Sequence, residues 1–188
     1  MKAGIVGAGA VGSIFAYFFN KAKIESAFYE KDAEIVRQVK KGLNVIVDDK
    51  IEVISIDIDD TPDILKGCGV IFLFVKSYST DNAVKDIKDK IDRNSIVVTL
   101  QNGIGNKERI SKYISDDRIV YGSTSIGATK VDANTVRLGG MGNFVIGGKS
   151  SDAVKTVEDI FKMAKFEVEM TASPDVAVWK KRSSLLSK

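Results

Sequence analysis

The chain has 188 residues, of which 44% are hydrophobic and 28% are charged. These proportions predict a folded globular protein with one domain and a sizeable core. Lys and Arg number 28 against 25 Asp and Glu, and the basic residues form no run that would indicate nucleic-acid binding. The chain has no histidine and one cysteine, Cys68. This excludes a Ser-His triad, a His-ligated metal and a thiolate cluster, and it fits a cytoplasmic protein without disulfides.

The segment GIVGAGAVGSIFAYFF, residues 4–19, predicts a nucleotide-binding turn. It is shorter than the ~20 apolar residues of a membrane helix, and no good signal-peptide cleavage site follows it. We expect a strand at residues 2–6, a helix at residues 11–19, and between them a GxGxxG turn that holds a pyrophosphate at the helix N-terminus. The candidate cofactor-binding residues of this turn are Gly7, Ala8, Gly9, Ala10, Val11 and Gly12.

An acidic residue follows the second expected strand, IESAFYE at residues 24–30. Glu30 lies after Gly12 at close to the ~20-residue spacing of a ribose-binding carboxylate. A carboxylate there suits the ribose 2′-OH and repels a 2′-phosphate, which favours NAD(H). Lys31, the next residue, is a cation that can accommodate a 2′-phosphate, so NADP(H) is the alternative cofactor. The alternative is a glycine-rich turn that binds nothing, but the order of strand, turn, helix, strand and acid favours a dinucleotide.

Predicted helices and strands alternate along the rest of the chain. Helices are expected at 33–41, 80–91, around Ile110 and Ile114, and at 154–164; strands are expected at 70–75, 95–100, 118–122, 135–140, 143–148 and 166–170. Two alternating runs, LNVIV and IEVISIDI, predict a small hairpin leading into the sheet. The pattern predicts an α/β fold with a Rossmann-type doubly wound, mostly parallel sheet.

The domain organisation follows from the same pattern. We expect a dinucleotide-binding domain over residues 1–171. Residues 172–188 then form the first helix of a helical domain that is otherwise truncated or missing, with Ser173 as its N-cap and Pro174 in its first turn. From the apolar residues on this helix we expect that it docks on a partner or is the start of a missing segment.

Three polar residues are candidates for the crevice, because ligands of an open parallel sheet bind beyond the carboxyl ends of its strands. Lys76 follows the strand VIFLFV and can hold a carboxylate or a phosphate, or simply be exposed at a strand end. Asn102 follows SIVVTL and can bind a ligand, or serve only as a turn-forming Asn-Gly. Lys181 is a candidate proton donor, since there is no histidine; alternatively, KKR at residues 180–182 is a solvated charge cluster.

Together these motifs resemble the ketopantoate reductases, also called 2-dehydropantoate 2-reductases. The resemblance covers essentially the whole chain through GAGAVG at Gly7, VKSYST at Val75, LQNGIGN at Leu100, GSTSIGA at Gly122 and VWKK at Val178. It implies an oxidoreductase that reduces ketopantoate, a small 2-oxo acid, to pantoate with NAD(P)H, on the route to pantothenate and coenzyme A. It also implies that Lys181 is the catalytic lysine and that Lys76 and Asn102 orient cofactor and substrate.

The sequence departs from the family's pattern in three places. Family members continue into a helical second domain, so we expect the activity of this chain to be impaired by truncation or completed by a partner chain. A homo-oligomer is a further option. Arg182 and Leu185 stand where the family has a leucine and a substrate-binding asparagine. Glu30 replaces a basic residue of many NADPH-dependent relatives. The alternative to a reductase is therefore a non-catalytic NAD(P)-binding module that regulates or completes a partner. A third interpretation, an FAD-binding or methyltransferase domain, does not explain the motifs VKSYST and LQNGIGN.

Overall fold

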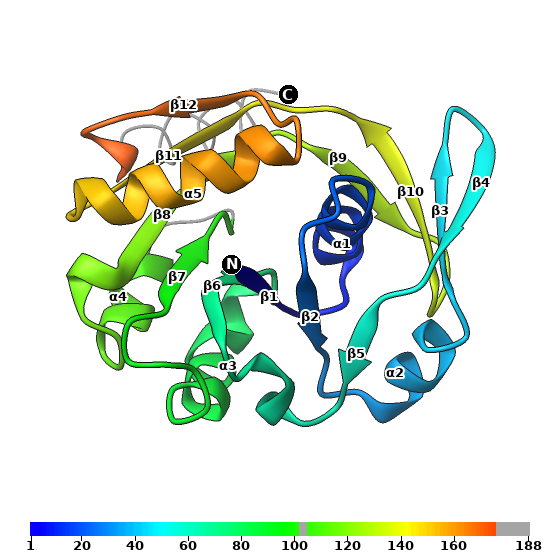
Figure 1. Ribbon diagram of the computed structural model, residues 1–188, viewed down its shortest axis with the longest axis horizontal. Helices are drawn as coiled ribbons and strands as arrows, with labels where there is room; N and C mark the ends of the chain where they lie inside the picture. The colour runs from blue at the N-terminus through cyan, green and yellow to red at the C-terminus, as the bar shows by residue number, and fades with distance from the viewer. Residues whose placement is uncertain (102–104, 176–188) are drawn as a thin grey trace.

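The computed structural model describes residues 1–101 and 105–175, and an eight-stranded sheet forms its centre (Figure 1). The strands, in sheet order, are β12 (Val168–Met170), β11 (Phe144–Gly148), β8 (Ile119–Thr124), β7 (Ile96–Thr99), β6 (Cys68–Leu73), β1 (Lys2–Val6), β2 (Ser26–Tyr29) and β5 (Asp57–Asp59). Within the described residues, β8 and β11 are the one antiparallel pair of this sheet, and the other neighbours are parallel. The chain winds outward from β1 in both directions, so the predicted Rossmann-type, doubly wound α/β fold is confirmed.

Helices cover both faces of this sheet. They are α1 (Ala10–Lys21), α2 (Ala33–Val39), α3 (Thr80–Ile87), α4 (Asn106–Ser111) and α5 (Ser151–Met163), with short 3-10 turns η1 (Pro62–Leu65), η2 (Ser77–Ser79) and η3 (Asp116–Arg118). The helices predicted at 33–41 and 80–91 therefore end earlier than expected, at Val39 and Ile87. Within residues 1–101 and 105–175, no helix combines the length and hydropathy needed to cross a bilayer.

The strand β6 explains why the sheet needs cover on both faces. Successive side chains of a strand point to opposite faces, and in β6 both sets are apolar. Val70 and Phe72 belong to the core cluster under α1 and α5, whereas Ile71 and Leu73 belong to the cluster under α3 and α4. The continuous apolar run is thus a central strand buried on two sides, as predicted.

A second, four-stranded sheet lies beside α1 (Figure 1), with the order β4 (Lys50–Ile54), β3 (Leu43–Val47), β10 (Thr135–Gly140) and β9 (Gly127–Lys130). The predicted hairpin exists, since β3 and β4 pair antiparallel, but it belongs to this second sheet. The run IEVISIDI splits between the two sheets, because β4 ends at Ile54 and Asp57–Asp59 pair with β2 as β5. The partner of β3 is β10, about ninety residues later, where Asn44 lies opposite Thr135.

An aromatic cluster fixes α1 to the main sheet and to α5. The ring of Phe15 on α1 is fully buried and has its centroid 4.4–5.9 Å from those of six other phenylalanines. These are Phe19, Phe72, Phe74, Phe144, Phe161 and Phe166. Aromatic pairs of this kind stabilise the fold by more than the burial of their apolar area alone. The position of α1 therefore depends on contacts with segments far away in sequence.

The Phe15→Ala variant is expected to lower the free energy of unfolding by roughly 3–5 kcal/mol, because it opens a cavity at the centre of this cluster. Chemical denaturation of the variant and the unmodified chain measures this loss. Tyr78→Ala is the control, since Tyr78 is 76% exposed and its removal should leave the unfolding free energy nearly unchanged. A loss below about 1 kcal/mol for Phe15→Ala, the size typical of an ordinary substitution, would contradict the central role of this ring.

The C-terminal end of the described chain packs onto the main sheet. Pro174 is buried against Gly147, and the Tyr121 hydroxyl donates a hydrogen bond of 2.9 Å to the Asp175 carboxylate. Residues 176–188 lie outside the described residues, so the helix expected at 172–188 stays a prediction, as does the domain boundary at residue 171.

Candidate functional site

A cavity of about 290 Å³ lies at the carboxyl ends of β1, β2 and β6. Its walls come from the segments that follow these three strands, from α3 and from Lys130 at the end of β9. The chain leaves β1 toward β2 on one side and returns to β6 on the other, so the cavity sits where the strand order reverses. This is the position in which open α/β sheets bind their ligands.

Two glycines of the turn between β1 and α1 are required by the fold itself. Gly7 has φ +101°, a conformation that side chains disfavour. A Cβ atom on Gly12 would lie 2.2 Å from the Gly7 carbonyl oxygen. Helix α1 therefore packs directly on the turn that precedes it.

Gly9 differs from these two, because the protein leaves space around it. Among the described residues, a Cβ atom on Gly9 would have one neighbour within 4 Å beyond its chain neighbours, the Phe74 carbonyl oxygen at 3.8 Å, and φ is −71°. Packing within the protein thus does not explain a glycine here. Gly9 is also the N-cap of α1 and supplies no side-chain cap, so N–H groups at the start of the helix, which begins with Ala10 and Val11, are left for an anion. The turn fits the close approach of a pyrophosphate.

The Glu30 carboxylate lies in the cavity at the end of β2 and is held by two backbone N–H groups. The N–H of Ala8 donates to Oε2 at 2.7 Å, and the N–H of Asp32 donates to Oε1 at 3.0 Å. This places the acid against the glycine turn, where the sequence predicted a ribose-binding group. Lys31, its exposed neighbour, also lines the cavity.

Lys130 was not among the residues predicted from the sequence, yet it reaches the same turn from the second sheet. Its ammonium donates a hydrogen bond to the Ala8 carbonyl oxygen and lines the cavity. Burial lowers the pKa of Lys130, and the Glu30 carboxylate acts in the opposite direction. Both polar groups of Ala8 are therefore bound, its N–H by Glu30 and its carbonyl by Lys130. No local pattern around GATK indicates this contact, because it depends on the pairing of β9 with β10.

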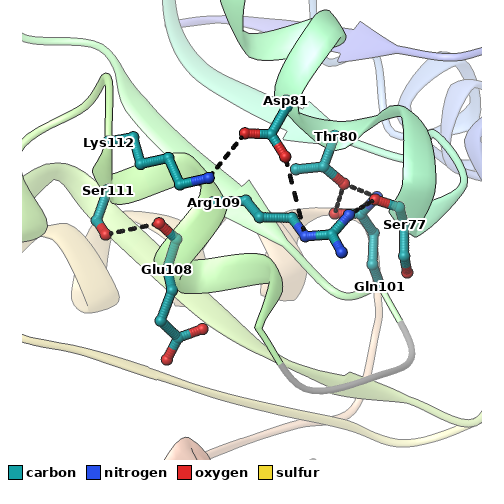
Figure 2. A network of polar contacts seen from close by, with 8 residues as sticks. All are labelled: Ser77, Thr80, Asp81, Gln101, Glu108, Arg109, Ser111 and Lys112. Carbon is teal, nitrogen blue, oxygen red and sulfur yellow. Dashed lines mark hydrogen bonds and ion pairs between the residues drawn. The ribbon is translucent and has the colours of Figure 1, made fainter.

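Lys76 stands in the loop after β6, exposed to solvent and lining the cavity. Gln101 donates from Nε2 to the carbonyl oxygen of Val75, one residue before it. Arg109 on α4 donates to the carbonyl oxygen of Ser77, one residue after it, at 2.6 Å (Figure 2). Gln101 belongs to the motif LQNGIGN noted in the sequence, whereas nothing in the sequence indicated Arg109.

The remaining sequence-predicted residues do not add to the described site. Asn102 and Lys181 lie outside the described residues, so their roles stay predictions. Cys68 is buried, and burial raises the pKa of its thiol to about 11, which keeps it protonated at neutral pH. In residues 1–101 and 105–175 no group of three or more acidic or cysteine side chains could hold a metal ion.

Most of this chain matches a known protein family. The family model described as "Ketopantoate reductase PanE/ApbA" matches residues 3–151. The chain belongs to this family. The predicted resemblance to the ketopantoate reductases is therefore confirmed.

Relatives and solved structures agree with this membership. The chain is 32% identical to the 2-dehydropantoate 2-reductase of Pyrococcus horikoshii and 28% identical to that of Halobacterium salinarum. In each case the match covers 96% of this chain, and it covers 58% and 61% of the relatives. A structure of D-mandelate dehydrogenase with NADH and anilino(oxo)acetate matches with a TM-score of 0.89 and 25% identity, over 96% of this chain and 60% of that one. The chain thus spans about 60% of the length of the ketopantoate reductases it matches.

Two alanine variants distinguish a glycine required by the fold from a glycine reserved for a ligand. Gly12→Ala is expected to lower the unfolding free energy by about 2 kcal/mol or more, because its Cβ collides with a backbone oxygen. Gly9→Ala should leave it within about 0.5 kcal/mol. Denaturant unfolding of both variants measures the difference. Equal losses would mean that Gly9, too, is constrained by the fold.

Proposed function

We propose that this ketopantoate reductase family member binds NAD(H) or NADP(H) and reduces ketopantoate to pantoate. The observation that carries the proposal is the cavity at the reversal of the strand order, which brings the glycine turn, Glu30 and Lys76 to one place. The relatives named 2-dehydropantoate 2-reductase support the substrate. The structural neighbour solved with NADH supports a nicotinamide dinucleotide.

The residues around the cavity fit the parts of a dinucleotide. In the proposal the pyrophosphate lies over Gly9 at the N-terminus of α1, where the protein leaves space and helix N–H groups favour an anion. Glu30, oriented by its two backbone N–H partners, accepts hydrogen bonds from the adenosine ribose. Lys76, at the edge of β6, supplies a cation for a phosphate or for the carboxylate of the 2-oxo acid.

The chemical step needs a proton donor beside the keto group. A bound reduced nicotinamide supplies hydride to the keto carbon. In the proposal Lys181 protonates the oxygen that becomes the alcohol, and Asn102 orients the substrate by donating and accepting hydrogen bonds. The lysine ammonium also stabilises the negative charge that develops on this oxygen mainly in the transition state. Stabilisation of that charge lowers the activation barrier.

The first prediction of this proposal concerns Lys181. The purified chain should oxidise NADH or NADPH when ketopantoate is added, seen as loss of the reduced-nicotinamide absorbance. Lys181→Ala should lower turnover by a factor of ~10²–10⁴, as expected for a removed general acid, while cofactor affinity changes little. Lys180→Ala, the adjacent lysine, serves as the matched control and should retain the rate.

Three outcomes separate the candidate functions. Turnover that depends on Lys181 supports the reductase. Cofactor binding without turnover supports the non-catalytic NAD(P)-binding module instead. Full turnover in Lys181→Ala would show that another group donates the proton.

The second prediction concerns the choice of cofactor. Glu30→Gln should raise the affinity for NADPH relative to NADH by roughly tenfold, because it removes a negative charge facing the 2′-phosphate. Titration of both cofactors by protein fluorescence measures the ratio. Glu34→Gln is the control, since this exposed acid on α2 pairs with Arg37 away from the cavity. An unchanged ratio in Glu30→Gln would exclude Glu30 as the group that selects the cofactor.

A further inference from the structure

The loop that carries Lys76 is held at three consecutive carbonyl groups. The Val75 carbonyl accepts from the Gln101 side chain, the Lys76 carbonyl accepts from the N–H of Ser79 at 2.7 Å, and the Ser77 carbonyl accepts from Arg109 at 2.6 Å. One of these donors is local, whereas Gln101 follows β7 and Arg109 lies on α4. Two side chains distant in sequence thus fix the backbone on both sides of Lys76.

The Gln101 amide is itself held by two buried threonines, of which Figure 2 labels Thr80. Thr99 Oγ1 donates to Gln101 Oε1 at 2.8 Å, and the backbone N–H of Gln101 donates back to the same hydroxyl at 3.3 Å. Thr80 Oγ1 lies 3.0 Å from Gln101 Nε2 and 3.3 Å from Gln101 Oε1, so it contacts both ends of the amide. Thr80 and Thr99 are 0% and 3% exposed. With its oxygen bound to Thr99, the amide must direct its NH₂ group to the Val75 carbonyl.

Arg109 is held from the outer side by an acid of α3. Its Nε lies 3.9 Å from one carboxylate oxygen of Asp81, and the other oxygen pairs with Lys112 at 3.2 Å. Figure 2 shows the chain of contacts from Lys112 through Asp81 to Arg109 and Ser77. Arg109 and Asp81 are partly buried, while Lys112 is exposed. The guanidinium is therefore fixed between α3 and α4 with one N–H group directed at the loop.

We propose that Gln101 and Arg109 are positioning residues that hold the Lys76 loop in the shape in which Lys76 binds the dinucleotide, an inference that rests on the proposed function. Lys76 is exposed and its side chain has several rotatable bonds, so its ammonium is restrained mainly through the backbone. A lysine on a fixed loop loses less conformational entropy when it binds a phosphate. The two side chains act through Lys76 and need not touch the ligand.

A double-mutant cycle tests this role. Gln101→Met and Arg109→Met keep the approximate side-chain volume and remove the donors; each should weaken NADH and NADPH binding by roughly five- to tenfold. Lys76→Ala should weaken it at least as much. Combined with Lys76→Ala, neither substitution should lower the affinity further, because residues that act through one another are not additive. Arg109→Lys, which keeps a cationic donor, should restore part of the loss.

Two controls separate positioning from charge and from folding. Lys107→Met removes a positive charge from the same helix, α4, where Lys107 pairs with Asp116 rather than with Asp81, and should leave the affinity unchanged. Circular dichroism and thermal unfolding of every variant show whether it is folded, and the cycle is evaluated on the folded ones. If a substitution acts only through the fold or through long-range electrostatics, it should lower the cofactor affinity by the same factor in the unmodified chain and in Lys76→Ala.

The outcomes distinguish this inference from the function on which it rests. Non-additive losses, with partial rescue by Arg109→Lys, support it. Losses that add to that of Lys76→Ala, or no losses at all, overturn it while cofactor binding by the unmodified chain still supports the proposed function. If Lys76→Ala binds as well as the unmodified chain, Lys76 is no binding group and the inference fails. If the unmodified chain binds neither cofactor, the proposed function fails first, and the inference with it.

Discussion

The contact of Gly12 with the Gly7 carbonyl controls both the core and the cavity. Because no side chain separates them, α1 starts directly on top of the turn that leaves β1. One turn further along the helix, Phe15 then enters the aromatic cluster between the main sheet and α5. The same placement leaves the N-terminus of α1, with its free N–H groups, at the edge of the cavity. Packing energy from the phenylalanines therefore also holds the anion-binding end of the helix in place.

The second sheet contributes to the turn through Lys130. Ala8 donates to Glu30 at the end of β2 and accepts from Lys130 at the end of β9, so its peptide groups are bound from both sheets. Each of these bonds brings an ionised side chain to a backbone dipole, the type of hydrogen bond that is shorter and stronger than average. The conformation of the turn is thus determined by residues 22 and 122 positions away from Ala8. A local glycine motif alone does not account for it.

The sequence predicted those features that depend on local patterns. The apolar run of β6 and the glycine spacing indicated the sheet and the turn, because burial and backbone sterics leave their marks in neighbouring residues. The run IEVISIDI alternates in the same way for β4 and β5, so periodicity did not show that it serves two sheets. Lys130 and Arg109 look like ordinary surface cations in sequence. Their contacts with Ala8 and Ser77 follow from the tertiary fold and could not have been predicted from spacing.

The polar groups of the described site lie around the cavity proposed for the dinucleotide. Gly9, Glu30 and Lys76 meet at one cavity, and each has a defined backbone position. Asn102 and Lys181, proposed for substrate orientation and proton transfer, lie outside the described residues, and the related reductases are longer than the region matched here. In the proposed function, cofactor binding and turnover are therefore separable. Binding rests on the contacts around Gly9, Glu30 and Lys76, whereas the proposed turnover also requires the proton donor.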